Sequence, residues 1–477
     1  MAAEKRRAWI AVASVVVVAL LIAPHRSLST DAYLSLVCGR EVVEHGLPHV
    51  DALTAVSSGK AWVDQQWLGQ ALIYAAERAG GLRLAIALHV LLAGAAAAIC
   101  AWYAERRGAS AAAVFVAGLA AFAVEGAFLT LRPQMFSLVA FAALLALLGD
   151  DLAAPSYKVF FVWPILALWA NLHGVMVVGV GLVGLRALFD VAGGVRSRAP
   201  RRVGRGVLLG GVAAVTPFCS PYARELPGYF ARIGHLQDAN RQLPIVEWLR
   251  PTLKNDWAFY LILVVFVAPL VVVWIRRKVG PGLFQAIVLG VAGVASLRAG
   301  RHMIWFGLAL AAYGPVLFDG LAVVREGPVI HRVASVVAML GPLAIVAALV
   351  RLGLTSDARL ERYRPAAAIA PLRDALAKEP GGARVVASDT LSDWLLWHAP
   401  ELAGRVEFDV RFELYDDKQA RELDTFLFAG RGYRELYPDA PLALVSKESH
   451  PALAAGLREA PGSKVLWEDK DAVLLAR

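Results

Sequence analysis

The stretch WIAVASVVVVALLIAPHRSLSTDAYLSLVCGREVVEHG (Trp9–Gly46) holds two different kinds of apolar segment. Its first half, up to Ala23, is an unbroken apolar run near the length that crosses the hydrocarbon core of a bilayer. Its second half begins at Asp31 and is too apolar for a helix surrounded by water. A helix of that kind buries its apolar face at a membrane interface. The stretch therefore predicts a membrane span followed by an interfacial helix with an aspartate at its head.

Composition extends this interpretation to the whole chain. The 477 residues are 58% hydrophobic and 18% charged, with a mean hydropathy of +0.56. A soluble protein of this length carries more charge, and its apolar residues come in short periodic stripes rather than in long runs. The formal net charge is +9, but much of the excess lies in short loops between apolar runs. Loops on the cytoplasmic side of a membrane collect Lys and Arg, so no nucleic-acid partner is expected.

The long apolar runs predict about eleven transmembrane helices. They lie near 8–25, 83–103, 109–128, 134–150, 158–172, 174–192, 206–220, 257–275, 280–297, 303–322 and 333–352. With the basic loops inside, the N-terminus is cytoplasmic. The polar motifs then all fall on the outer side: the loop 26–82, LRPQ (131–134), NLHG (171–174), VEWLRP (246–251) and LRAGRH (297–302).

Two domains are predicted. Residues 1–354 form the transmembrane domain, and its first outer loop (26–82) carries two interfacial helices. The first begins at Asp31; the second runs from Gln65 to about Arg78, with Asp64 as a helix cap and Gly80-Gly81 as its end. Residues 355–477 alternate short β-like runs with helical patterns, which predicts a small extracytoplasmic α/β domain with some parallel strand pairs. LALVSK, KVLWED and AVLLAR are candidate strands. The three cysteines show no metal-ligand spacing and are expected to be packed thiols.

A family resemblance runs through nearly the whole chain. It rests on STDAYLSLVCGREVVEHGLPHVDALTAVSSGKAWVDQQWLGQ, LRPQMFSL, LWANLHGVMVVG, TPFCSPYARE, IVEWLRP, LRAGRHMIWFGLAL and DWLLWHAPELAGRVEFDVRFELY. With these pieces the chain resembles the GT-C superfamily of polytopic glycosyltransferases, which take a sugar from a polyprenyl-phosphate carrier. It looks most like an uncharacterised bacterial GT-C-like membrane protein group. The resemblance implies multi-pass insertion in the bacterial inner membrane, with the C-terminal domain on the periplasmic side.

The resemblance also implies a role for Asp31, as the base toward the acceptor or as a metal ligand. From spacing alone, Asp31 could equally cap its helix. Many lipid-phosphate-sugar transferases have a second acid directly after the first, and here Ala32 takes that place. If a second carboxylate is needed, the candidates are Asp51, Asp64, Glu125 and Glu247. A divalent cation (Mg²⁺ or Mn²⁺) is the expected cofactor if one is needed, held by Asp31 and Asp51.

A departing polyprenyl phosphate needs cations around it. Arg298, Arg301 and His302 lie within five positions at the outer end of a span, and Arg132 is expected at the same depth. These four are the candidate donor phosphate site, although a single outer arginine can also reach lipid headgroups.

A second group of residues is assigned to the acceptor or the sugar: His173, Glu247, Trp248 and Asp64. His173 could instead cap a helix end, and Trp248 could anchor at the interface. Asp409 and Arg411 are expected to end a strand and pair with neighbours.

Three functions remain open. The first is an inverting transferase that moves a sugar from a polyprenyl-phosphate donor to an extracytoplasmic glycan, lipid or protein, with Asp31 as base. The second is a transporter or flippase for a lipid-linked sugar, which would need ionisable residues deep in several spans and internal repeats. The third is a non-catalytic relative that serves as a scaffold for envelope assembly.

Overall fold

The computed structural model describes residues 8–125, 129–238, 246–268, 271–272, 275, 282–320, 324, 327–429 and 436–476. The chain divides into two compact units. Unit 1 consists of Met1–Ser27, Arg83–Ala223 and Val246–Thr355, and unit 2 of Leu28–Leu82, Arg224–Ile245 and Ser356–Arg477.

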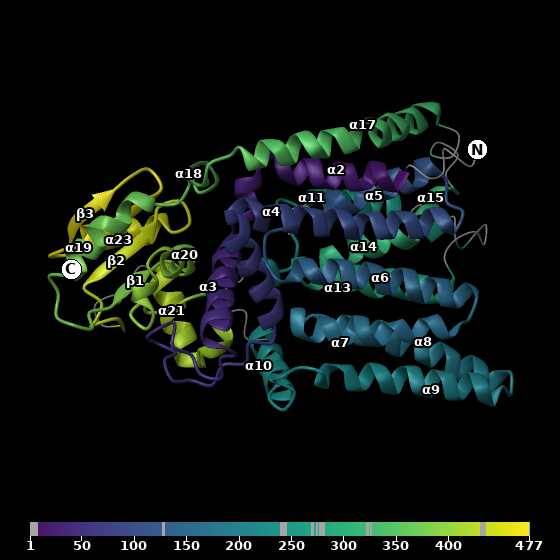
Figure 1. Cartoon of the computed structure of the whole chain (residues 1–477), viewed down its shortest axis with the longest axis horizontal. Helices are drawn as coiled ribbons and strands as arrows, with labels where there is room; N and C mark the ends of the chain where they lie inside the picture. The colour runs from purple at the N-terminus through teal and green to yellow at the C-terminus, as the bar shows by residue number, and fades with distance from the viewer. Residues whose placement is uncertain are drawn as a thin grey trace. The chain divides into compact units, whose positions relative to one another are not determined.

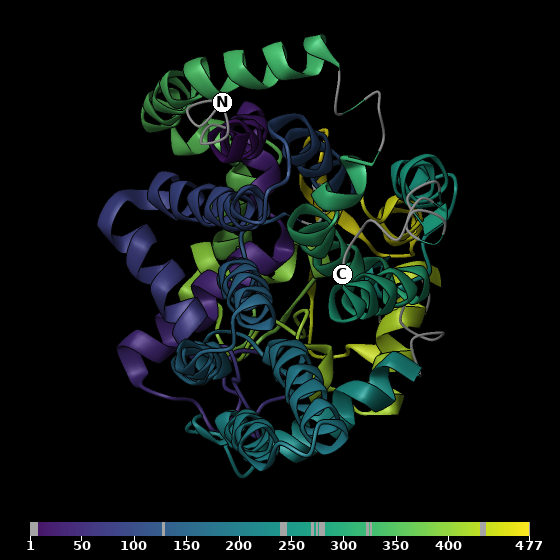
Figure 2. The ribbon, with the colours of Figure 1, turned by 90° about the vertical axis from the view of Figure 1, so that its right-hand side faces the viewer.

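Unit 1 is entirely helical in its described part. Its longer helices are α2 (Ala8–Ile22), the second half of α4 (Trp67–Arg106), α5 (Ala111–Glu125), α6 (Gln134–Ala153), α7 (Val162–Leu172), α8 (Met176–Arg196), α9 (Pro200–Val215), α11 (Trp257–Ile262), α13 (Leu283–Arg298), α14 (Met303–Tyr313), α15 (Pro315–Phe318) and α17 (Pro328–Gly353). Short turns of helix join them: η1 (Pro24–Ser27), η3 (Tyr157–Phe161), η4 (Thr216–Phe218), η5 (Val246–Trp248), the π-helical η6 (Leu263–Val267) and η7 (Gly300–His302). The long helices lie side by side, as the side and end views show (Figures 1 and 2).

Four described helices are long and apolar enough to cross a membrane: α4, α6, α8 and α17. Each matches a predicted span. Shorter apolar helices lie at 8–22, 111–124, 157–172 and 283–298, where four more spans are predicted. The 20 residues of α6 extend about 30 Å, the thickness of the hydrocarbon core. The count of eleven spans stays a prediction.

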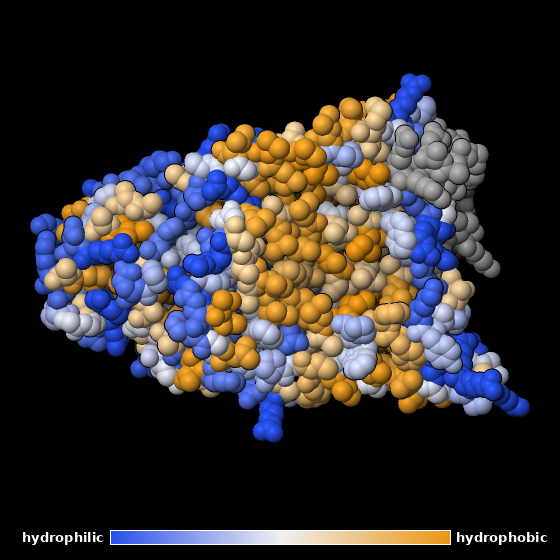
Figure 3. Space-filling view, in the orientation of Figure 1, coloured by the Kyte–Doolittle hydropathy of each residue, from blue (hydrophilic) through white to orange (hydrophobic). Residues whose placement is uncertain are grey.

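The exposed surface of these helices is apolar. On α17, Val329, Met339 and Leu343 are each more than 60% exposed. Orange surface accordingly covers much of the helices of unit 1 in Figure 3. Apolar side chains exposed to water raise the free energy of a protein, and lipid around them removes this penalty. The surface therefore fits a membrane environment.

Unit 1 has two chemically different ends. At one end, Arg106, the last residue of α4, forms an ion pair with Asp150 near the end of α6 (3.4 Å). At the opposite end of α6, the Leu131 amide donates to the Ser27 carbonyl (3.0 Å). We call these the basic end and the motif end. The contacts thus place the LRPQ motif and a basic loop at opposite ends of the same helix.

Unit 2 contains a sheet and its surrounding helices. The helices are α3 (Thr30–His45), the first half of α4, α10 (Leu226–Asp238), α18 (Asp357–Leu360), η8 (Ala366–Ala368), α19 (Ile369–Leu376), α20 (Asp389–His398), η9 (Pro400–Leu402), η10 (Phe412–Leu414), α21 (Asp417–Ala429) and α23 (Pro451–Glu459). The strands are β1 (Val385–Ala387), β2 (Leu442–Ser446), β3 (Lys464–Glu468) and β4 (Ala472–Ala476), in the order β1-β2-β4-β3.

The sheet agrees with the predicted strands and with the predicted parallel pairing. β1 pairs with β2 in parallel, at Val385↔Leu442, while β4 runs antiparallel to β2 and β3. The stretch RVEFDVRF (405–412) contributes only isolated bridges, at Val406. Asp409 and Arg411 therefore lie in a loop and not at the end of a strand.

The break predicted at Gly80-Gly81 is present inside α4. Gly81 has φ = 68°, which an L-residue with a side chain rarely adopts, so the helical path bends there. The predicted interfacial helix is thus the part of α4 that precedes this kink. It belongs to unit 2, and the apolar span that follows belongs to unit 1.

Helix α3 packs against α20 within unit 2. The Tyr33 hydroxyl donates to the Glu361 carboxylate (2.7 Å), and the Arg40 guanidinium donates to the Leu396 carbonyl (2.8 Å). The loop 28–82 and the C-terminal segment therefore share one core, although more than 300 residues separate them in the sequence.

Candidate functional sites at the motif end and in unit 2

The arginine cluster lies at the motif end of unit 1. Arg132, just before α6, forms an ion pair with Glu247 (2.7 Å), and its side chain is only 11% exposed. Arg301 lies over the ring of Trp248, with its guanidinium carbon 5.5 Å from the ring centroid. The Gly300 amide donates to the Leu249 carbonyl (3.0 Å) and fixes η7 beside η5. Two predicted arginines are thus held by a carboxylate and an aromatic face from the same segment.

His173 belongs to the same cluster. It caps the C-terminus of α7, and its Nδ1 lies 3.2 Å from the Ser137 hydroxyl, which also accepts a hydrogen bond from the Trp169 indole (2.7 Å). Burial, together with the nearby charges of Arg132 and Arg301, lowers the pKa of His173 to about 3. The imidazole is therefore neutral at pH 7 and adds no charge to the cluster.

The two remaining residues predicted for the donor phosphate site, His302 and Arg298, differ in their surroundings. Burial and the neighbouring Arg301 lower the pKa of His302 to about 4, so it is also neutral. Arg298 is exposed in the last turn of α13, and within the described residues no contact joins it to the cluster. The printed contacts thus bring two guanidinium groups and one carboxylate together in the cluster.

A buried ionic group surrounds Arg411 in unit 2. The guanidinium contacts Asp51 (2.7 Å) and Asp409 (2.6 Å) and lies over the ring of Trp62 (4.4 Å). Arg411 is 3% exposed and both carboxylates are fully buried. Charges so far from water are stable only when paired in this way. The predicted pairing of Asp409 and Arg411 with their neighbours is therefore observed.

Asp51 is already occupied on both carboxylate oxygens. It accepts hydrogen bonds from the Leu53 amide (3.1 Å) and the Ser57 hydroxyl (2.7 Å) in addition to its ion pair with Arg411. Burial raises its pKa, but Arg411 and these donors outweigh burial and leave the pKa below its ordinary value. Among the described residues no three His, Cys, Asp or Glu are grouped to hold a metal ion. The requirement for a divalent cation held by Asp31 and Asp51 stays a prediction.

Two further acids of unit 2 are buried, and burial raises the pKa of each. Burial raises the pKa of Asp64 to about 7, against the opposing effect of Arg411. Asp393 on α20 is fully buried, and neither of its oxygens makes a hydrogen bond of ordinary geometry with the described residues. Burial and the negative charges of Asp409 and Asp31 raise its pKa well above the ordinary value, although Arg411 and the Val410 amide act in the opposite direction.

Asp31 lies at the accessible end of this group. Ser29 is the N-cap of α3 and Asp31 stands in its first turn. Asp31, Ser35 and Cys38 follow at i, i+4 and i+7 and so share one face of the helix. Ser35 and Cys38 are buried, whereas Asp31 is only half-buried. A carboxylate in this position can accept a proton from a bound hydroxyl group.

Asp393 was not among the predicted site residues. The sequence contains a signal for it, since SDWLLW places an acid between Leu391 and Trp394, two buried residues of the same helix. A buried acid on an apolar helix face calls for an explanation. Glu125, one candidate for a second carboxylate, has a side chain outside the described residues.

The structure therefore groups the predicted residues within each unit. Unit 1 brings together residues from four separated stretches: Arg132, His173, Glu247, Trp248, Arg301 and His302. Unit 2 brings together Asp31, Asp51 and Asp64 with three residues of the C-terminal segment: Asp393, Asp409 and Arg411.

Comparisons identify the fold. No family model matches the chain, and no curated protein matches its sequence. ArnT from Cupriavidus metallidurans, bound to undecaprenyl phosphate, is similar in structure with a TM-score of 0.55 at 16% identity, over 97% of each chain. The oligosaccharyltransferase of Archaeoglobus fulgidus in the apo form has a TM-score of 0.55 at 12% identity, over 95% of this chain and 71% of that one.

The apolar helices and these two structures define the class as a membrane protein with transmembrane helices. More particularly, the chain shares the fold of ArnT and of this oligosaccharyltransferase, as the resemblance to the GT-C superfamily led us to expect.

Proposed function

We propose that the chain is an integral-membrane glycosyltransferase that moves a sugar from a polyprenyl-phosphate donor to an extracytoplasmic acceptor. The observation that carries the proposal is the arginine cluster, in which Arg132 and Arg301 are brought together from distant stretches beside a neutral His173. The similarity to a protein bound to undecaprenyl phosphate adds support for a phosphate carrier.

In this proposal the acceptor hydroxyl oxygen attacks the anomeric carbon of the donor sugar. The bond between that carbon and the phosphate oxygen breaks, and the electron pair leaves with the polyprenyl phosphate. Asp31 takes the hydroxyl proton, and Arg132 and Arg301 meet the negative charge that develops on the phosphate. A direct displacement inverts the anomeric centre. The sugar-binding roles assigned to Glu247, Trp248 and Asp64 are part of the same proposal.

The test is undecaprenyl phosphate binding to the purified full chain, together with sugar transfer in membranes. We expect Arg301→Ala to lose binding by about tenfold or more, because a charge-assisted contact is removed. Asp31→Asn should bind the carrier normally but lose transfer. Arg298→Ala tests whether this exposed arginine also contributes to binding of the carrier phosphate.

Arg332→Ala on α17 is the matched control, since it removes an exposed arginine outside the cluster. Undiminished transfer by Asp31→Asn would exclude Asp31 as the base. Carrier binding without transfer in the wild-type chain would favour a carrier-handling role such as a flippase, and no carrier binding by any form would favour the scaffold.

A further inference from the structure

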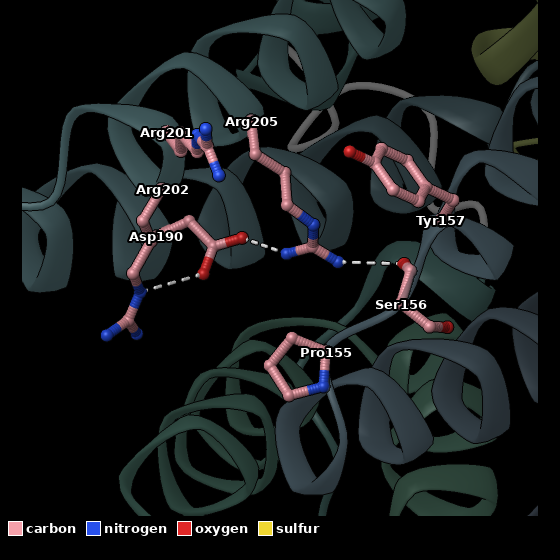
Figure 4. Close-up of a pocket in the computed structure, with 7 residues that line it drawn as sticks. All are labelled: Pro155, Ser156, Tyr157, Asp190, Arg201, Arg202 and Arg205. Atoms are coloured by element: carbon pink, nitrogen blue, oxygen red, sulfur yellow. Dashed lines mark hydrogen bonds and ion pairs between the residues drawn. The ribbon is translucent and has the colours of Figure 1, made fainter.

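A second charged site lies at the basic end of unit 1. A pocket of about 360 Å³ opens there between the start of η3, the end of α8 and the first turns of α9. Its lining consists of Pro155, Ser156, Tyr157, Asp190, Arg201, Arg202 and Arg205 (Figure 4). Three arginines and one aspartate therefore face the same cavity.

The floor of this pocket is a buried ionic network. Arg186 is 1% exposed and contacts Asp151 (2.7 Å) and Asp190 (2.8 Å). Arg205 contacts the same two aspartates and donates to the Ser156 carbonyl (3.1 Å). Arg186 and Arg205 together therefore balance the negative charge of Asp151 and Asp190.

The two other arginines supply the excess charge. Arg202 reaches Asp190 at 3.3 Å, and half of its side chain is exposed. Arg201 is exposed and makes no ion pair or hydrogen bond with any described residue. Figure 4 shows Arg201 and Tyr157 on either side of Arg205. Since α9 begins at Pro200, its free amides and the positive end of its dipole lie at the same place.

The surroundings identify the kind of anion. The helices that carry the pocket expose large apolar side chains: Leu188 and Val195 on α8 are each 65% exposed, and Val207 on α9 is 62% exposed. Tyr157, 86% exposed at the mouth, has the amphipathic ring typical of a membrane interface. An anionic group with acyl chains attached satisfies both the arginines and the apolar helix faces.

We propose that this pocket binds the phosphate headgroup of an anionic phospholipid. It is separate from the arginine cluster, because α8 starts three residues after His173 and ends beside the pocket. The 21 residues of α8 extend about 31 Å. The proposal therefore does not depend on the proposed transferase function.

The test is native mass spectrometry of the purified full chain with added lipid. Phosphatidylglycerol should bind at least about tenfold more tightly than phosphatidylcholine. Arg201→Gln should weaken phosphatidylglycerol binding about fivefold, and Arg201→Gln with Arg202→Gln should lower it to the level of phosphatidylcholine. Arg201→Gln removes no contact among the described residues, so the variant tests binding without disturbing the fold.

The matched control is Arg196→Gln with Arg198→Gln. These two exposed arginines lie at the same end of unit 1 but do not line the pocket. Equal loss in both double variants would mean that only general charge attracts the lipid, which overturns the proposal. Glycerol 3-phosphate serves as the soluble competitor. If it displaces phosphatidylglycerol when both are at the same concentration, the site binds a free phosphate ester instead of a lipid.

Discussion

At the scale of single residues, Arg411 decides the state of the acids around it. It is the one cation in contact with Asp51 and Asp409 among the described residues, and its charge also acts on Asp64 and Asp393. One guanidinium cannot neutralise four carboxylates. Burial raises the pKa values of Asp64 and Asp393 despite the opposing charge of Arg411.

Replacing Arg411 should destabilise the protein strongly. Arg411→Leu leaves Asp51 and Asp409 buried without a counter-ion, which typically costs about 3–5 kcal/mol. We expect a large fall in the midpoint of thermal unfolding of the purified chain. Arg373→Leu is the control, because its ion pair with Glu401 is exposed to solvent and should contribute little to stability. Equal effects of the two substitutions would contradict the paired-charge interpretation.

Asp64 should make stability depend on pH. Burial raises its folded-state pKa to about 7, so between about pH 4 and pH 7 the folded chain holds a proton that the unfolded chain releases. This contribution to stability is complete below the unfolded pKa and is lost as the pH rises through 7. Relative to Asp64→Asn, the wild type should therefore lose stability as the pH rises from about 4 to about 7.

The measurement is the thermal unfolding midpoint of both forms at several pH values. Asp374→Asn, an exposed acid on α19, serves as the charge-matched control. Parallel curves for wild type and Asp64→Asn would show that Asp64 is ionised throughout.

The residue types of the arginine cluster could be predicted because their motifs are local. LRPQ, NLHG, VEWLRP and LRAGRH each occupy a few adjacent positions near the end of an apolar run. Asp393 could not be assigned in this way, because its chemistry comes from Asp31, Asp409 and Arg411, which lie elsewhere in the sequence. Burial and charge environment are properties of tertiary contacts, and no spacing rule supplies them.

At the scale of helices and strands, the sequence predicted an element correctly where a long apolar run or a helix-breaking glycine pair marked it. The apolar runs predicted α4, α6, α8 and α17, and Gly80-Gly81 predicted the kink in α4. The stretch 405–412 looked like a strand because its apolar residues alternate. It instead forms isolated bridges at Val406, followed by a loop in which Arg411 makes its buried ion pairs.

The packing of α3 on the first half of α4 depends on Gly39. A Cβ at this position would lie 2.3 Å from the Gln70 carbonyl oxygen, which belongs to the backbone and cannot rotate away. We expect Gly39→Ala to destabilise the protein by about 1–3 kcal/mol, as overpacking usually does. Gly228→Ala on α10 is the control, because its Cβ would meet nothing within 4 Å. Thermal unfolding of both variants distinguishes close packing from a general effect of alanine.

At the scale of the whole molecule, unit 2 is assembled from distant parts of the chain. The Ala55 amide donates to the Val406 carbonyl (2.8 Å), and the Val56 amide donates to the Glu407 carbonyl (3.0 Å). The Lys60 ammonium donates to the Leu414 carbonyl (2.9 Å). The loop 28–82 thus depends on the C-terminal segment for backbone partners as well as for its core. Local sequence patterns carry no signal for such pairings, and the predicted domains treated the two segments separately.

A chain that ends at Thr355 should therefore lose the structure of its first outer loop. Without the C-terminal segment, the backbone amides of Ala55 and Val56 lose their partners and the apolar face of α3 is uncovered. We expect trypsin to cleave the truncated chain after Lys60 at least about tenfold faster than the full chain, since cleavage requires local opening. Cleavage after Arg198, in the turn between α8 and α9 of unit 1, should be unchanged. Equal protection of Lys60 in both chains would mean that the loop folds by itself, and the two segments would then be separate domains after all.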